Sequence, residues 1–249
     1  FLGSHTMNIP QDNKTQYLLR ISFPMMLSWL SCVLMVFVDR MFLANFSKEA
    51  LAAAVAAGMS AWTFTFAAQT LAELSEIYVA QYNGAGKFEK LGACTWQMLY
   101  VAAFSILLFT PLAFLGESFY QNSINGLNKA NYFKWLTLAG PFNVVLGSLM
   151  GFFVGQGKTF IITKAFILGN LVNVILDPLF IFGFEPILDS HGITGAAIAT
   201  NIGLISQCLY LAYFFFSKEN KEKLGTAKFS FRPSLLKADR KSTRLNSSH

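Results

Sequence analysis

Four acidic side chains of this 249-residue chain lie inside long apolar stretches, where an ionised group is costly: Asp39, Glu73, Glu76 and Asp177. A charged side chain at the centre of a membrane-spanning helix costs about 2.5–3.5 kcal/mol on insertion scales. Residues that persist there are candidates for cation binding or proton exchange. What they can do depends on the helix faces and depths at which they lie.

The clearest pattern surrounds Asp177. Asn170, Asn173 and Asp177 follow the spacing i, i+3, i+7 and therefore share one face of a helix. Two amides and a carboxylate must face other helices or water, because lipid cannot satisfy them. Their oxygen atoms can bind a cation or share a proton with water. The alternative is a structural hydrogen-bond network between helices, and it weighs most for Asn170.

Polar residues of three helices are expected at a similar depth. At about 1.5 Å per residue, Asp39 lies about 28 Å and Asp177 about 25 Å from the expected inner ends of their helices. Thr200 lies about 12 Å into a helix that returns from the outside. We therefore expect Asp39, Asn173, Asp177 and Thr200 to converge in the outer half. Two carboxylates close together in a low dielectric resist double ionisation, so a proton or a sodium ion would relieve their repulsion.

Arg40 follows Asp39 directly in the sequence. A local salt bridge at the outer interface is one interpretation. Neighbouring helical residues point about 100° apart, so Arg40 can instead extend outward while Asp39 faces the interior. The sequence favours this second interpretation.

Gln69, Glu73 and Glu76 form another polar stripe, at i, i+4, i+7. Glu73 lies about 33 Å from the outer start of its helix, which places it near the inner mouth. A solvated carboxylate is the more ordinary interpretation. The alternative is a vestibule charge that attracts cationic solutes.

Prolines fall inside four of the expected helices, at Pro24, Pro111, Pro141 and Pro178. Each removes one backbone hydrogen bond and bends its helix. Prolines are common in membrane helices. Beside intramembrane acids, however, Pro24 and Pro178 suit helices that must bend during a transport cycle.

The elements that carry these residues are expected to be membrane-spanning helices. The chain is 54% hydrophobic and only 13% charged, against about 25% charged in soluble domains. Six apolar blocks are long enough to span a bilayer, at about residues 17–45, 50–82, 92–115, 131–154, 160–184 and 192–216. The fold class is therefore an all-α membrane protein.

Lysines and arginines indicate the orientation. They gather on the side of both chain ends, whereas the opposite side carries Lys48, Lys129 and Lys134. By the positive-inside rule both ends are cytoplasmic, and we expect a multi-pass protein of the plasma (inner) membrane. The net charge of +6 arises from short loops and the tail, so nucleic acid is not an expected partner but the lipid bilayer is.

The two ends of the sequence are expected to lie outside the fold. Residues 1–6 resemble a non-native leader and residues 240–249 a translated adapter. Between them we expect a six-helix body over 7–216 and a polar, basic cytoplasmic loop over 217–239, which is solvated or anchors at the lipid surface.

Enzyme and cofactor signatures are not expected. Cys32, Cys94 and Cys208 lie in apolar blocks without metal-ligand spacing. The sequence GQGKT at 155–159 lacks the full spacing of a phosphate loop. We expect no catalytic residues, no cofactor and no metal beyond a sodium ion at Asp39, Asn173, Asp177 and Thr200.

Several segments together resemble the multidrug and toxin extrusion (MATE) family. They are residues 37–43 (FVDRMFL), 79–86 (VAQYNGAG), 155–159 (GQGKT), 170–178 (NLVNVILDP) and 192–200 (GITGAAIAT). Their order and spacing fit from about residue 14 to 237. The resemblance implies a twelve-helix antiporter of two six-helix lobes, of which this chain is the N-terminal lobe and the C-terminal lobe is missing.

The resemblance also implies a function and a site. Family members export organic cations in exchange for protons or sodium, and the coupling site matches Asp39, Asn173, Asp177 and Thr200. Glu73 and Glu76 stand where small and hydroxyl residues are usual, which puts the substrate choice of the inner vestibule in doubt. The alternatives are a lipid-linked oligosaccharide flippase of the same superfamily, which would favour basic residues in the cavity, and an inactive membrane fragment.

Overall fold

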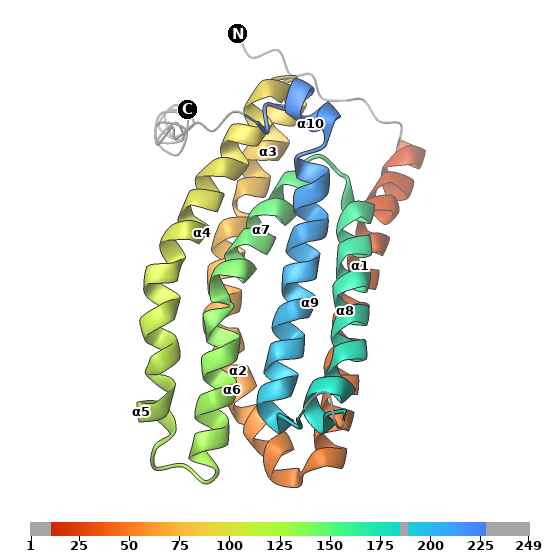
Figure 1. Cartoon of the computed structure of the whole chain (residues 1–249). Coiled ribbons are helices and arrows are strands. Elements are labelled where there is room, and N and C mark those ends of the chain that lie inside the picture. The colour runs from red at the N-terminus through yellow and green to blue at the C-terminus, as the bar shows by residue number, and fades with distance from the viewer. Residues whose placement is uncertain (1–10, 185–188, 228–249) are drawn as a thin grey trace, which may run out of the picture.

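A computed structural model of the chain describes residues 11–184 and 189–227. Helices make up almost all of this part (Figure 1). In chain order they are α1 Gln11–Phe46, α2 Lys48–Glu73, α3 Ser75–Gly84, the 3-10 turn η1 Phe88–Lys90, α4 Leu91–Phe114, α5 Gly116–Tyr120, α6 Gly126–Leu138, α7 Gly140–Val154, α8 Thr159–Phe182, α9 Gly192–Phe215 and α10 Lys218–Lys223.

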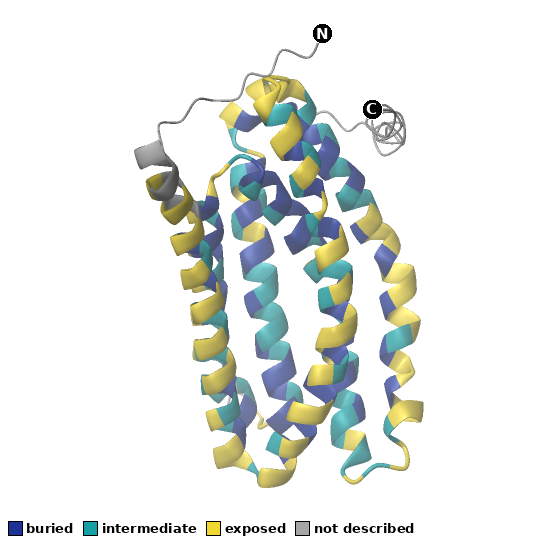
Figure 2. Ribbon diagram, turned by 180° about the vertical axis from the view of Figure 1, so that it is seen from behind, coloured by how far each residue is buried: buried dark blue, intermediate teal, exposed yellow. Residues whose placement is uncertain are grey.

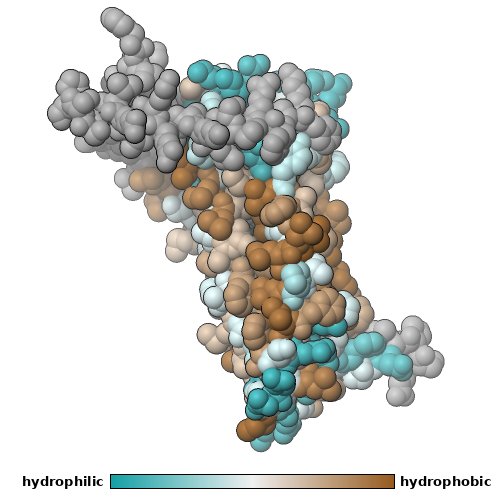
Figure 3. Space-filling model, turned by 90° about the vertical axis from the view of Figure 1, so that its left-hand side faces the viewer, coloured by the Kyte–Doolittle hydropathy of each residue, from teal (hydrophilic) through white to brown (hydrophobic). Residues whose placement is uncertain are grey.

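The described helices include six segments long and apolar enough to cross a membrane. They run side by side as a bundle, and large apolar side chains lie exposed on its outer surface, as Figure 2 shows by burial. On the face shown in Figure 3, hydrophobic atoms occupy the middle and hydrophilic atoms gather at both ends. The prediction of an all-α membrane protein with six spanning helices is confirmed.

Two ends of the bundle can be distinguished in Figure 1. We call them the α10 end, where α3, η1 and α10 lie, and the α5 end, where α1 meets α2 and α8 connects to α9. Each end has its own apolar core. Phe152, Phe153 and Phe215 pack together toward the α10 end, with the Phe152 and Phe215 ring centroids 4.8 Å apart. Leu43, Phe133 and Ile181 belong to the core toward the α5 end.

Two of the predicted uninterrupted helices are broken. The block at 50–82 divides at Leu74 into α2 and α3, and the block at 131–154 divides at Ala139 into α6 and α7. Pro141 therefore lies in the first turn of α7 and not inside a helix, where its missing N–H costs little.

Glycines of α7 allow the broken α2–α3 segment to approach closely. A Cβ atom at Gly147 would lie 2.5 Å from the carbonyl oxygen of Gln69, and one at Gly151 would collide with Ser75 Oγ. Small residues at four-residue spacing are a common means of close helix packing in membranes. α7 therefore packs closely against the end of α2 that carries Glu73.

The segment after α9 packs against the bundle, which differs from the predicted solvated loop. The indole of Trp96 donates a 2.8 Å hydrogen bond to the carbonyl of Thr226, and the Gly92 amide donates to the Leu224 carbonyl at 2.9 Å. Thr226 is fully buried, so the packed body extends past residue 216. The expected leader at 1–6 and adapter at 240–249, and the loop beyond residue 227, lie outside the described residues.

Candidate functional site

The structure brings the predicted site residues of α8 and α9 into contact. Asn173 Nδ2 donates to Asp177 Oδ1 at 3.1 Å and approaches Thr200 Oγ1 at 3.5 Å. Asn173 and Asp177 are one turn apart on α8, so the i, i+4 spacing places them together. Thr200 also donates to the Ala196 carbonyl of its own helix at 2.9 Å.

Asp39 of α1 lines the same cavity as Asn173 and Thr200. No hydrogen bond joins its carboxylate to Asp177 within the described residues. Asp39 is 4% exposed and Asp177 is fully buried. We call Asp39, Asn173, Asp177 and Thr200 the acid cluster. Its four members come from α1, α8 and α9.

The acid cluster holds oxygen atoms without a partner. Asp39 Oδ1, Asn173 Oδ1 and Asp177 Oδ2 are each buried with no hydrogen-bond donor within the described structure. A buried acceptor left unpaired costs about 1–3 kcal/mol, and more when it is charged. Oxygen atoms of this kind can accept a hydrogen bond from a protonated carboxyl group or bind a cation.

Arg40 does not extend outward, so that prediction is wrong. Its Nη1 lies 3.3 Å from Asp39 Oδ2 and donates a long, 3.4 Å hydrogen bond to Tyr132 Oη on α6. Its guanidinium carbon also lies 5.9 Å from the centre of the Tyr132 ring. A Cβ atom at Gly58 would come within 3.1 Å of the guanidinium, so the glycine provides room for the inward position.

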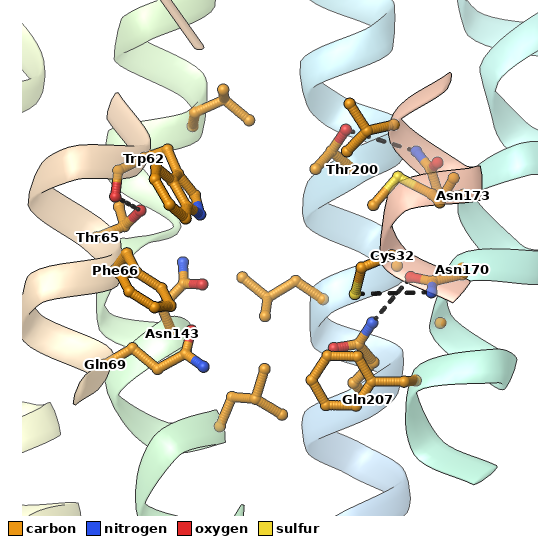
Figure 4. Close-up of a pocket in the computed structure, with 18 of the residues that line it drawn as sticks. Cys32, Trp62, Thr65, Phe66, Gln69, Asn143, Asn170, Asn173, Thr200 and Gln207 are labelled. Atoms are coloured by element: carbon orange, nitrogen blue, oxygen red, sulfur yellow. Dashed lines mark hydrogen bonds between the residues drawn. The ribbon is translucent and has the colours of Figure 1, made fainter. Parts of the chain in front are cut away.

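A cavity of about 480 Å³ opens beside the acid cluster and extends along the bundle. Figure 4 shows residues of α2 on one side of it and residues of α8 and α9 on the other. Asp39, Asn173 and Thr200 line the cavity. Asp177 is not among the lining residues, so Asn173 lies between it and the cavity.

Asn170 belongs to a separate hydrogen-bond network. Its amide donates to Ser31 Oγ at 2.7 Å, and its Oδ1 accepts from Gln207 Nε2 at 3.4 Å. Its Nδ2 also lies 3.9 Å from the sulfur of Cys32, which lines the cavity (Figure 4). Asn170 thus shares a face with Asp177, as predicted, yet it joins α1, α8 and α9 through other partners.

Glu73 is half-buried and lines the same cavity. Its Oε1 accepts a 2.9 Å hydrogen bond from Gln69. The predicted stripe ends there, because α2 stops at Glu73. Glu76 lies on α3 and is not among the lining residues.

The prolines expected to bend helices lie inside α1 and α8. The carbonyl oxygen of Pro24 accepts hydrogen bonds from Ser28 Oγ at 3.0 Å and Thr163 Oγ1 at 2.7 Å. These contacts tie α1 to α8 near Pro24. Pro178 follows Asp177 directly, so the bend-prone point of α8 adjoins the acid cluster.

Some residues of the site were missed from the sequence. Tyr132 and Gly58 hold Arg40, and Gln207 bonds Asn170. Only the placement of Gln207 in an otherwise apolar block gave a signal. Nothing in a single sequence pairs Arg40 with Tyr132, which is 92 residues away.

Comparison with known proteins decides the family. The MatE family model matches residues 24–179, more than half of the chain. The chain belongs to the MATE family. Within it, the chain corresponds to the N-terminal half, and MATE proteins are transporters and not enzymes.

Individual MATE relatives are distant but cover most of the chain. It is 23% identical to the multidrug export protein MepA of Staphylococcus aureus, over 84% of this chain and 49% of that protein. A crystal structure of a MATE mutant superposes with a TM-score of 0.77 at 22% identity, covering 89% of this chain and 50% of the other. A MOP superfamily transporter from Pyrococcus furiosus matches with a TM-score of 0.68 at 22% identity, covering 89% and 49%. The chain thus spans about half the length of the relatives it matches.

Proposed function

We propose that this chain is one lobe of a secondary antiporter that exports organic cations across the plasma membrane in exchange for an inward-moving ion. Asp39, Asn173, Asp177 and Thr200 form the coupling site, and a C-terminal lobe completes the transporter. Both ends of this lobe face the cytoplasm, so the α10 end is the inner end. The MATE membership and the multidrug export function of MepA support the transport class.

The observation that carries the proposal is the unsatisfied acid cluster. Three buried oxygens of Asp39, Asn173 and Asp177 lack donors, and two of these residues line a cavity large enough for a drug-sized molecule. Carboxylate and amide oxygens that have no donor within the protein are available to accept a proton-bearing group or to bind an ion.

The position of Arg40 sets the charge balance of the coupling site. Two ionised carboxylates and one guanidinium carry a net charge of −1, so one proton or one sodium ion makes the group neutral. Either ion adds one positive charge beside the guanidinium, so Arg40 opposes the binding of both and favours their release.

In this proposal, ion binding is coupled to rearrangement of the lobe through the cost of keeping two buried carboxylates ionised. A proton that enters from outside neutralises one carboxyl of the acid cluster and removes the repulsion between Asp39 and Asp177. The lobe can then rearrange, with α1 bending at Pro24, where the helix lacks one backbone hydrogen bond. Loss of the proton to the inside restores the charge and resets the lobe.

A lipid-linked oligosaccharide flippase is the second candidate from the same superfamily. It would need bases in the cavity to meet a pyrophosphate. Among the described lining residues the only base is Arg40, which already pairs with Asp39. The lining also carries the carboxylate of Glu73. This charge distribution favours a cationic substrate.

The test uses membrane vesicles that contain the full-length transporter. Asp177→Asn and Asp39→Asn keep the side-chain shape but remove the charge, so each should abolish gradient-driven efflux of ethidium while leaving expression and insertion intact. Efflux by Asp177→Asn at the wild-type rate under both proton and sodium gradients would contradict the proposal.

The proposed orientation has its own test. Lys129→Cys should react with a membrane-impermeant thiol reagent that is added from outside, and not with one that is added from inside.

A further inference from the structure

Glu73 differs from the other carboxylate that lines the cavity in having no positively charged partner. Among the described residues, no lysine, arginine or histidine pairs with it, and the amide of Gln69 is its hydrogen-bond donor. A carboxylate within a membrane-spanning segment is costly unless it is paired or solvated. The fold therefore presents an uncompensated negative charge to the cavity.

The face of α2 that carries Glu73 has a regular composition. Trp62, Phe66, Gln69 and Glu73 follow the spacing i, i+4, i+7, i+11, so they lie along one stripe of the helix, and all four line the cavity. The stripe extends over about 16 Å at 1.5 Å per residue. Figure 4 shows Trp62, Phe66 and Gln69 along the same wall. The helix thus presents two aromatic rings, an amide and a carboxylate in order.

Aromatic rings from α1 and α2 form an apolar surface at this stripe. The rings of Trp62 and Phe66 stack with centroids 4.7 Å apart, and Trp29 of α1 meets Phe66 edge-on at 6.4 Å. Trp29 and Trp62 are each 57% exposed, so ring surface remains free for a ligand. Aromatic faces attract cations, and they do so most strongly where water is excluded.

The two ends of the cavity differ in what they offer to a ligand's charge. At the acid cluster, Arg40 repels a second cation and neutralises Asp39. At Glu73, nothing in the described residues does either. A cationic ligand in the cavity is therefore drawn away from Arg40 and toward Glu73.

We propose that Trp29, Trp62, Phe66, Gln69 and Glu73 form a binding site for a lipophilic organic monocation, with the charge at Glu73 and the apolar body on the aromatic rings. The inference rests on the proposed function, because it takes the cavity to be the path of the exported substrate. It goes further in assigning the substrate's charge to Glu73 and the coupling ion to the acid cluster. Met25 and Met150 complete the lining with side chains that adapt to ligands of different shape.

The test measures equilibrium binding to the whole chain in lipid nanodiscs. The probes are tetraphenylphosphonium, a lipophilic monocation, and triphenylphosphine oxide, a neutral compound of similar chemistry. Binding is followed by equilibrium dialysis and by quenching of tryptophan fluorescence. Glu73→Gln should weaken binding of the phosphonium about tenfold or more, as expected for loss of a charged partner. It should leave binding of the neutral oxide unchanged.

Glu76→Gln is the matched control, since Glu76 lies outside the cavity and three residues away on α3. It should change both affinities far less than Glu73→Gln changes the affinity for the phosphonium. Trp62→Leu should weaken the binding of both probes. Glu73→Asp, which retains the charge, should bind the phosphonium better than Glu73→Gln and guards against a general effect of substitution at this position. Equal phosphonium binding by wild type and Glu73→Gln would overturn the site, and so would equal losses in Glu73→Gln and Glu76→Gln.

Failure of this site and failure of the proposed function give different results. Binding that depends on Glu73, together with normal efflux by Asp177→Asn in the full-length transporter, would retain the site and remove the coupling role. Efflux that requires Asp177, together with phosphonium binding that is unchanged in Glu73→Gln, would retain the coupling role and remove the site.

Discussion

The two ends of the cavity carry acidic side chains in opposite settings. Toward the α5 end, Asp39 lies 3.3 Å from the guanidinium of Arg40, and Asp39 and Asp177 are almost fully buried. Toward the α10 end, Glu73 is half-buried, accepts a hydrogen bond from Gln69 and lines the cavity together with Trp62 and Phe66. A carboxylate whose counter-charge is built into the fold has its charge balanced within the protein. A carboxylate without one is suited to bind a cationic ligand.

The largest expected loss of stability comes from removing Arg40, the cation that pairs with Asp39. Arg40→Gln leaves Asp39 buried without its cation. Removing one partner of a fully buried pair costs about 3–5 kcal/mol, and the cost here is smaller because a quarter of the Arg40 side chain is exposed. Thermal unfolding followed by tryptophan fluorescence should show a clear decrease in Tm.

Two further variants complete this comparison. Asp39→Asn added to Arg40→Gln should recover much of the loss, since residue 39 then carries no charge that needs Arg40. Glu73→Gln should cost little or nothing, because Glu73 has no protein cation to lose. Equal destabilisation by Arg40→Gln and Glu73→Gln would remove the distinction between the two ends.

The next effect concerns the space that lets Arg40 turn inward. Gly58→Ala places a Cβ atom 3.1 Å from the guanidinium and 3.3 Å from the Tyr132 ring, so one of these groups must move. This crowding should offset part of the roughly 1 kcal/mol that alanine gains over glycine inside a helix, so Gly58→Ala should be less stable than a variant without the crowding. Gly84→Ala is the matched control, because a Cβ atom there meets nothing within 4 Å. Chemical denaturation that finds the two variants equally stable would contradict the inward packing of Arg40.

A smaller effect is expected from the hydroxyl of Tyr132. Tyr132→Phe keeps the ring against Arg40 and removes the acceptor that lies 3.4 Å from Nη1. A single hydrogen bond contributes about 0.5–1.5 kcal/mol, and this long one should be at the lower end. Tyr213→Phe, at a side chain that is 75% exposed, should leave the unfolding free energy unchanged. A double-mutant cycle with Arg40→Gln should show that the loss at Tyr132 depends on Arg40.

The smallest effect is predicted for an exposed ion pair. Lys223 Nζ lies 3.1 Å from Glu219 Oε1 on α10, and this hydrogen bond lowers the pKa of Glu219. A depressed folded-state pKa stabilises above the ordinary pKa of the group, and that contribution is lost as the pH falls. Since both side chains are exposed, water and salt screen the pair. Glu219→Gln should leave Tm unchanged at neutral pH, in contrast to Arg40→Gln.

Local spacing predicted what lies on one helix. The i, i+4 relation of Asn173 and Asp177 is a property of any α-helix, so their contact could be predicted without a partner helix. The matched depths of Asp39 and Thr200 followed from helix length and apolar blocks alone. Six spanning helices were predictable for the same reason, because the bilayer fixes their length and composition.

What the sequence could not predict depends on contacts between distant segments. The direction of Arg40 is decided by Gly58 and Tyr132, which belong to other helices. The stripe from Gln69 to Glu76 assumed one straight helix, whereas packing against Gly147 and Gly151 accompanies a break at Leu74. The docking of residues 224–226 on α4 likewise rests on Trp96 and Gly92, more than 120 residues earlier.

The most direct test of the account compares Asp177→Asn and Glu73→Gln in vesicles of the full-length transporter, with tetraphenylphosphonium efflux measured against its concentration under a proton gradient. The account predicts that Asp177→Asn abolishes gradient-driven efflux at every concentration. It predicts that Glu73→Gln raises the concentration needed for half-maximal efflux but approaches the wild-type rate at saturation. The reverse pattern, with coupling lost in Glu73→Gln and only apparent affinity changed in Asp177→Asn, would contradict the division of roles between the two ends of the cavity.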